Sequence, residues 1–133
     1  MLESYLPPLI GYFSYLASGV AMLIVFAMLY IKITPYDEIK LVREGNVAAA
    51  LSFAGALIGF SFALASSAWH LNHLVFFVIW GALAGLMQIL VYAFLVKCIK
   101  GMPEQIMNNN VAVGVLAGSI SVAVGVINAG CLS

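Results

Sequence analysis

The stretch LVFFVIWGALAGLMQILVYAFLV, residues 74–96, decides the fold of this chain of 133 residues. It holds no charged residue, and as a helix it is long enough to cross about 30 Å of hydrocarbon. Three more stretches share its length and character, and they run over Pro8–Ile31, Val47–Ala68 and Val111–Leu132. Because a backbone in lipid must satisfy its own hydrogen bonds, continuous apolar runs predict helices. We therefore expect an all-α integral membrane protein with four transmembrane helices.

The composition supports a membrane protein over a soluble one. The chain is 65% hydrophobic and 8% charged, whereas soluble domains are about half apolar and about a quarter charged. The formal net charge is zero, so the chain has no basic surface to neutralise phosphates. We expect the lipid bilayer as the surrounding partner, and we expect no nucleic acid.

The basic residues predict the orientation of the helices. Every Lys and Arg lies either between the first two apolar stretches or between the last two: Lys32, Lys40, Arg43, Lys97 and Lys100. Loops with an excess of Lys and Arg stay in the cytoplasm. The sequence therefore predicts a bacterial inner-membrane protein with both termini in the periplasm. Tyr30 and Tyr92 fall near the cytoplasmic boundary, where an aromatic belt is expected.

The two halves of the chain resemble each other at an offset of about 65 residues. Gly19–Leu29 aligns with Gly85–Leu95, and Asn46–Ala50 aligns with Asn110–Gly114. Two copies with an even number of spans share one orientation, as parallel repeats do. We expect two two-helix transmembrane repeats, over residues 1–68 and 69–133.

Each predicted cytoplasmic loop carries a proline and acidic residues. Thr34-Pro35 predicts an N-cap followed by proline at the first helical position of a short amphipathic helix, within residues 35–45. The matching segment of the second half is shorter by roughly one turn. Asn46 and Asn110 are suited to cap the helices that follow.

Several of these motifs resemble a known family. Lys32-Ile33-Thr34-Pro35, Asn46–Phe53 and the final Ile127–Cys131 are similar to the YjfL-like family of small bacterial inner-membrane proteins (domain of unknown function 350). The resemblance covers nearly the whole chain. It implies a duplicated two-helix unit in the inner membrane, and it supplies no known reaction.

Small residues four positions apart form stripes on three of the predicted helices. Such stripes let two helix backbones approach closely, either within one chain or between chains in a homo-oligomer, for which a dimer is the default. The helix-packing candidates are Gly55, Gly59, Gly81, Gly85, Gly114 and Gly118.

Polar residues near the predicted membrane are candidates for a solute path or gate. Glu38 is either a solvated acid at a helix start or part of a cation gate at the cytoplasmic mouth, with Glu44 and Glu104 as companions. Gln88 either makes an interhelical hydrogen bond or lines a solute path. The remaining path candidates are Asn46, Asn110 and Asn128.

The sequence offers few signs of catalysis or metal binding. His70 and His73 could share a helical face, but no cysteine or acid lies nearby, so a polar outer loop is favoured over a metal site. Cys98 and Cys131 fall on opposite sides of the membrane, too far apart for a disulfide. We expect no enzyme, no cofactor and no catalytic residue.

Two functions therefore stay open. One is an oligomeric channel or transporter for a small ion or solute, which the parallel repeat, the polar Ser, Asn and Gln residues and the acids at the cytoplasmic mouth favour. The other is a non-transporting scaffold that binds another membrane or envelope protein, which the small-residue stripes favour, together with the lack of charge within the predicted spans.

Overall fold

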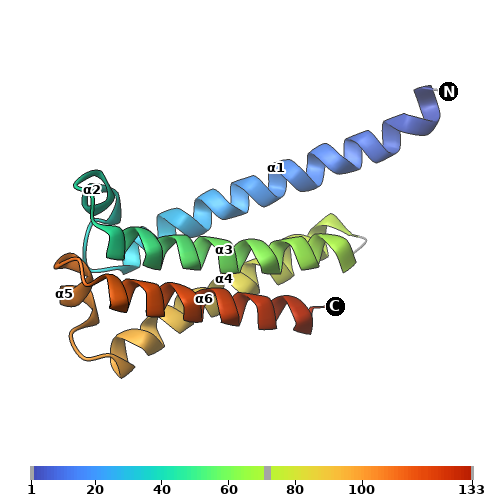
Figure 1. Ribbon diagram of the computed structural model, residues 1–133. Helices are drawn as coiled ribbons and strands as arrows, with labels where there is room; N and C mark the ends of the chain where they lie inside the picture. The colour runs from blue at the N-terminus through green and yellow to red at the C-terminus, as the bar shows by residue number, and fades with distance from the viewer. Residues whose placement is uncertain (1, 71–72, 133) are drawn as a thin grey trace.

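The computed structural model describes residues 2–70 and 73–132, without the side chains of residues 2–6 and 70. Its described part is helical apart from short connections and contains no strand. Four helices are long and apolar enough to cross a membrane, which confirms the predicted fold class. The elements follow in the order α1 (Leu2–Ile33), α2 (Glu38–Arg43), α3 (Val47–His70), α4 (Leu74–Cys98), α5 (Met102–Met107) and α6 (Val111–Cys131) (Figure 1).

The helices form a bundle with one divergent member. α3 and α6 lie side by side, and α4 crosses behind them at an angle (Figure 1). α1 packs against α3 and α4 and diverges from them towards its N-terminal end. The short helices α2 and α5 lie together at one end of the bundle, which also holds all five basic residues and is called the basic end below.

α3 and α6 make the tightest contact in the bundle, and they run parallel to each other. A Cβ added to Gly55 would collide with the backbone of Gly118, and one added to Gly125 would collide with that of Gly59. Ser66 extends the contact by donating to the carbonyl oxygen of Ala129 at 2.6 Å. Only glycine permits backbones to meet this closely, so the small-residue stripes of α3 and α6 act within the chain.

The glycines of α4, Gly81 and Gly85, contact the side chains of neighbouring helices rather than their backbones. A Cβ on Gly81 would collide with the side chains of Met22 and Leu64, and one on Gly85 would press against Phe60. The ring of Phe60 in turn stacks on Phe26 with 4.5 Å between centroids. The glycines of α4 therefore provide the space into which side chains of α1 and α3 pack.

The start of α2 differs from the prediction. The helix begins at Glu38, and its N-cap is Asp37, whose Oδ1 accepts from the backbone N–H of Lys40 at 3.3 Å. The predicted N-cap at Thr34 is wrong because its hydroxyl serves the end of α1, 2.9 Å from the carbonyl oxygen of Ile31. The predicted shortening of the second loop by a turn is also wrong, since residues 99–110 are only one fewer than residues 34–46 and α2 and α5 each span six residues.

α2 ends in a turn that leads directly into α3. Gly45 adopts a left-handed conformation with φ 84°. Its N–H donates to the carbonyl oxygen of Val42, and the N–H of Asn46 donates to that of Leu41. These two bonds form a Schellman motif, which satisfies the last carbonyls of a helix. Asn46 then caps α3 by accepting from the N–H of Ala49 at 2.8 Å.

α5 ends in a turn of the same construction. Asn109 takes the left-handed position with φ 61°, and its N–H donates to the carbonyl oxygen of Ile106. The N–H of Asn110 donates to the carbonyl oxygen of Gln105, and Asn110 caps α6 by accepting from the N–H of Val113. The sequence therefore predicted both helix caps correctly.

The two turns are also bonded to each other. The amide of Asn46 donates to the carbonyl oxygens of Ile106 and Met107 at 2.8 and 3.2 Å. The backbone N–H of Ala48 also donates to the side-chain oxygen of Asn109 at 3.1 Å, so the first turn supplies the donor in all three bonds. These bonds fix α5 against the start of α3 and make the basic end one packed unit.

Candidate functional site: a buried carboxyl at the basic end

Glu38 occupies the first position of α2, and its side chain is enclosed by the bundle. It is 1% exposed, and neither carboxylate oxygen has a hydrogen-bond partner among the described residues. Buried charged groups are ordinarily paired or hydrogen-bonded, because removing a charge from water is costly. An acid in this state is a candidate functional group rather than a surface charge.

Three tyrosines from separate parts of the chain surround this carboxyl. Tyr30 comes from α1, Tyr36 from the α1–α2 connection and Tyr92 from α4, and all three are buried. The rings of Tyr30 and Tyr92 meet edge to face at 5.2 Å. Each hydroxyl lies within electrostatic range of Glu38. Together with Glu38, these residues are called the tyrosine–glutamate cluster.

The surroundings favour the protonated form of Glu38. Burial, with a smaller contribution from the charge of Asp37, raises the pKa of the Glu38 carboxyl from 4.5 to about 7. The nearby Thr34 hydroxyl offsets part of this rise, although its closest acceptors are backbone carbonyl oxygens. Burial also raises the pKa of Tyr36, whose phenol therefore stays neutral. The site can exchange a proton close to neutral pH.

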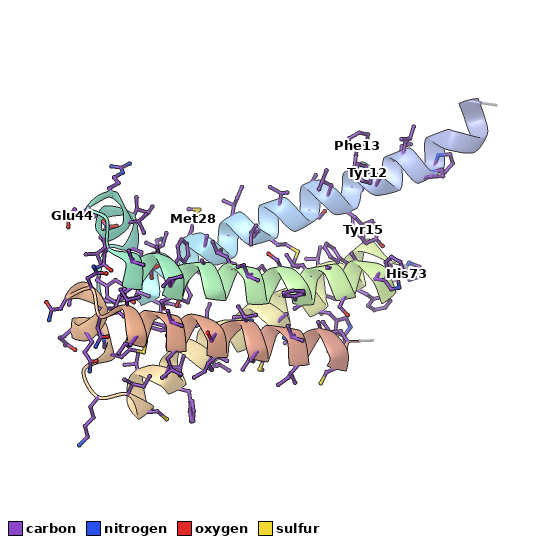
Figure 2. The ribbon with its side chains drawn as sticks, in the orientation of Figure 1. Tyr12, Phe13, Tyr15, Met28, Glu44 and His73 are labelled. Carbon is purple, nitrogen blue, oxygen red and sulfur yellow. The ribbon has the colours of Figure 1, made fainter. Side chains whose placement is uncertain are left out.

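The other predicted members of a cation gate do not join Glu38. Glu44 and Glu104 are exposed; Glu44 is the C-cap residue of α2, and Glu104 lies in the separate helix α5. Figure 2 shows the side chain of Glu44 at the outside of the bundle. Asn110 is also exposed, whereas Asn46 is buried in bonds to α5. The structure therefore does not assemble the predicted group of acids at a common mouth.

Gln88 lies in the interior of the bundle, between α4 and α6. It is 1% exposed and donates its Nε2 to the carbonyl oxygen of Ser121 at 3.2 Å. Gly59 makes room for this amide, because a Cβ there would meet both Nε2 and the Ser121 carbonyl. The interhelical hydrogen bond is therefore present. The Oε1 atom has no partner among the described residues, so part of the amide stays unsatisfied.

Two more polar side chains lie towards the opposite end of the bundle. Ser67 of α3 is fully buried, and its hydroxyl has no partner among the described residues. The Nδ2 atom of Asn128 on α6 is also buried and has no hydrogen-bond partner among the described residues. The sequence singled out Asn128 but not Ser67, since one serine in a helix rich in small residues carries no distinguishing signal.

The tyrosine–glutamate cluster was also missed by sequence reasoning. Tyr30 and Tyr92 were interpreted as belt residues at the membrane boundary, and Tyr36 was not singled out. Sixty-two positions separate the first two in sequence, and only the packing of α1 against α4 joins them. The one available signal was the crowding of Thr34, Tyr36 and Glu38 around a proline.

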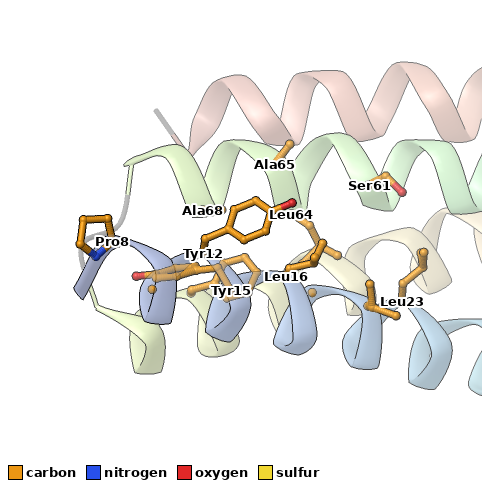
Figure 3. A pocket seen from close by; sticks show the side chains of 13 residues that line it. Pro8, Tyr12, Tyr15, Leu16, Leu23, Ser61, Leu64, Ala65 and Ala68 are labelled. Carbon is orange, nitrogen blue, oxygen red and sulfur yellow. The ribbon is translucent and has the colours of Figure 1, made fainter. Parts of the chain in front are cut away.

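The histidines and an apolar groove beside α1 offer no comparable chemistry. The ring of His73 is exposed and packs edge to face on Phe76, and the side chain of His70 lies outside the described residues. Within the described part of the chain, no group of three His, Cys, Asp or Glu residues could hold a metal. A groove of about 540 Å³ opens where α1 diverges, and its lining is almost wholly apolar (Figure 3).

Comparison with known proteins identifies the family. A family model described as Domain of Unknown Function (DUF350) matches residues 3–132. The chain belongs to this family. It is similar to the UPF0719 inner membrane protein YjfL of Escherichia coli strain K12, and equally to that of strain O157:H7, at 36% identity over 128 residues. Each match covers 96% of this chain and 97% of the relative.

Membership in the DUF350 family confirms part of the sequence analysis. The resemblance stated there is correct, and the chain is a multi-pass inner-membrane protein. No solved structure matches the fold. Neither the family description nor the names of the relatives state a reaction, a solute or a partner, so the function has to be argued from the site.

Proposed function

We propose that this protein is an oligomeric channel or transporter for a small ion or solute and carries out no catalytic reaction. In this proposal the basic end faces the cytoplasm and both termini are periplasmic. The distribution of Lys and Arg supports this orientation, because all five lie beside α2 and α5.

The observation that carries the proposal is the state of Glu38. Ionisable groups enclosed at the membrane are costly, and they commonly mark ion or proton pathways. Among the described residues, Glu38 has no salt-bridge or hydrogen-bond partner. A role in stabilising the fold therefore does not explain why an acid is buried here. The position of Glu38 at the basic end, which this proposal assigns to the cytoplasm, supports a role in taking up an ion from that side.

The oligomeric part of the proposal rests on the shared geometry of the two halves. The turns after α2 and α5 have the same bonds, and the parallel contact of α3 with α6 supports an internal duplication with its axis along the membrane normal. An apolar groove runs along the surface of α3 and α6, lined by residues that include Leu51, Ile58, Val115 and Val122. A homodimer joined here would bring four central helices together.

The test is ion flux in proteoliposomes. Protein shown by native mass spectrometry to be oligomeric is reconstituted, and the loss of imposed proton and potassium gradients is followed. Glu38→Gln should change the flux, and Glu44→Gln is the matched control because that acid is exposed at the C-cap of the same helix. Flux that is absent, or that both variants leave unchanged, contradicts the proposal.

A scaffold is the second candidate, and the contact between α3 and α6 favours it. The two backbones touch through glycines, which leaves no room for a solute between them. A chain built only for rigid packing would present its exposed apolar faces to another membrane protein. Absence of flux, together with one membrane protein that co-purifies in a fixed ratio, would favour this function.

A further inference from the structure

The composition of the tyrosine–glutamate cluster bears on which ion it binds. A metal cation in a dry site needs several oxygen ligands to replace its water shell. Glu38 is the cluster's only carboxylate, since Glu44 and Glu104 are exposed and Asp37 is engaged in capping α2. A proton needs a single oxygen, and its binding removes the buried charge. The cluster is therefore suited to a proton and poorly suited to a metal cation.

Unsatisfied polar atoms continue from this cluster into the membrane along α4. The hydroxyl of Tyr92 is buried with the Tyr36 hydroxyl as a nearby polar neighbour, and it makes no hydrogen bond of good geometry among the described residues. The Oε1 of Gln88 also has no partner there. Tyr92 and Gln88 are four apart in α4, so they lie on one face about 6 Å from each other. Gln88 is ten residues from the end of α4 at Cys98, or about 15 Å along the axis, close to the middle of the bilayer.

The same condition recurs near the periplasmic side. The buried hydroxyl of Ser67 and the buried Nδ2 of Asn128 face into the bundle from α3 and α6 without a partner among the described residues. Buried polar atoms of this kind are normally satisfied by ordered water when protein supplies no partner. All of these atoms lie on the helices α3, α4 and α6 or on the adjoining α2.

We propose that the transported ion is a proton, which is bound by Glu38 and passed along water held by Tyr92 and Gln88, with exit past Ser67 and Asn128. This inference rests on the proposed transport function and names its substrate. We call the series of polar atoms the polar track.

Each step of this transfer is a balanced proton exchange. A cytoplasmic hydronium gives its proton to the Glu38 carboxylate, so one O–H bond breaks in the hydronium and one forms on the carboxyl. The carboxyl then gives the proton to a water molecule beside Tyr92, so the carboxylate is restored and that water becomes a hydronium. The hydronium passes a proton through further water past Ser67 and Asn128 to the periplasm, and becomes water again. The Tyr92 hydroxyl and the Gln88 amide orient the water beside Tyr92 and need not change protonation state.

The middle of the polar track is apolar. Ala63 of α3 and Ala84 of α4 are buried between Gln88 and the periplasmic pair. A continuous file of water would dissipate the proton gradient at all times, so this apolar interval keeps the protein closed at rest. Proton passage therefore requires α3 and α4 to separate here.

The groups that face Glu38 leave it free to titrate. From α1, α4 and the α1–α2 connection these are the hydroxyls of Tyr30, Tyr92 and Tyr36, and Asp37 is the charged neighbour. Within the described residues no Lys or Arg pairs with the carboxylate. Since no cation holds it ionised, its charge follows the cytoplasmic pH, with a pKa of about 7.

The deciding experiment measures voltage-driven proton uptake into proteoliposomes with an enclosed pH dye. We expect wild-type protein and Glu44→Gln to acidify the lumen at equal rates. Glu38→Gln and Gln88→Leu should be slower by about tenfold or more, since a loss of about 1.4 kcal/mol already gives a factor of ten. Gln88→Leu keeps the side-chain volume and removes the unsatisfied oxygen.

Potassium flux in the same vesicles separates this inference from the proposed function. Potassium flux that depends on Glu38, without proton uptake, contradicts the inference that the transported ion is a proton. The proposed transport function would then still hold. Absence of both fluxes overturns both. Proton uptake that Gln88→Leu leaves unchanged overturns the polar track.

A second measurement uses the wild-type protein and does not depend on the folding of variants. Infrared spectroscopy of protein labelled at glutamate should show one protonated carboxyl that disappears as pH rises through neutrality, and Glu38→Gln assigns the band. A Glu38 that stays ionised between about pH 5 and about pH 9 overturns the inference, because a carboxyl with an ordinary pKa near 4.3 has no protonated form to transfer there.

Discussion

The segments that contain α2 and α5 share their helix length and the turn that follows, although α2 starts after the extended Asp37 and α5 after the left-handed Gly101. They differ in the charge of the first helical side chain. Each has a helix of six residues, a left-handed residue and an asparagine that caps the next transmembrane helix. Their first helical residues are both buried, Glu38 at 1% and Met102 at 0% exposure. One position thus holds an unpaired acid where its counterpart holds an apolar side chain.

This difference indicates that the acid is not required by the fold. Methionine fills the position in the second segment at no electrostatic cost, because its flexible thioether adapts to an apolar cavity. Glutamate in the same setting must lose its hydration or its charge. A group that is costly for stability and dispensable for the backbone turn is a candidate for function.

The largest expected change in the free energy of unfolding comes from placing an acid in α5 at the position that corresponds to Glu38 in α2. Met102→Glu should lower the free energy of unfolding by about 4 kcal/mol at about pH 8, the usual range for an unpaired buried charge. The loss should shrink at about pH 5, where the new carboxyl is protonated. Denaturant unfolding in detergent micelles measures both values.

The matched control for this substitution is Met107→Glu, since Met107 is 42% exposed on the same helix. It should change the free energy of unfolding by less than about 0.5 kcal/mol. Equal losses for the two variants would show that the Met102 position tolerates charge, and the contrast with Glu38 would then lose its meaning.

Removing the acid from the first segment should have a pH-dependent effect. The folded state raises the pKa of Glu38 from 4.5 to about 7, so wild-type stability is highest below about pH 4.5 and falls as pH rises towards 7. Glu38→Gln should therefore be more stable than wild type at about pH 8, by up to about 3 kcal/mol, and equal to it at about pH 4.

Unfolding curves of Glu38→Gln and wild type across this pH range give the measurement, with the exposed Glu44→Gln as reference. A difference between Glu38→Gln and wild type that stays constant with pH would show that the Glu38 carboxyl titrates normally in the folded protein.

The smallest expected effect concerns the two caps. Asn46→Ala should cost about 2 kcal/mol, because it loses a helix cap and two buried bonds to α5. Asn110→Ala should cost about 1 kcal/mol or less, since its cap is exposed and long at 3.4 Å. Thermal unfolding of the two variants side by side makes the comparison, and a reversed order would mean that α5 is not held by Asn46.

The sequence predicted the elements well where local rules dominate. Four apolar runs without charge can only be membrane helices, and Asn46 and Asn110 are helix caps by residue type and position. It failed at Thr34, because the hydroxyl of Thr34 donates to the carbonyl oxygens of Ile31 and Tyr36, and Asp37 caps α2 instead.

The candidate site was predicted only in part. Glu38 was named from its position at a helix start, with a solvated acid as one interpretation, and its burial could not be derived. The burial of Glu38 depends on the packing of α1 against α4, which brings Tyr30 and Tyr92 together beside the carboxyl. No spacing within the sequence predicts this contact between two distant helices.

The sequence by itself determined the membrane, the helices and the caps, because each depends on hydrophobicity or on bonds within a few residues. The tertiary structure decided which glycines meet, where Glu38 lies and which polar atoms stay unsatisfied. The α3–α6 contact shows the reason: Gly55 and Gly118 are 63 positions apart in the chain, and only packing places one backbone against the other.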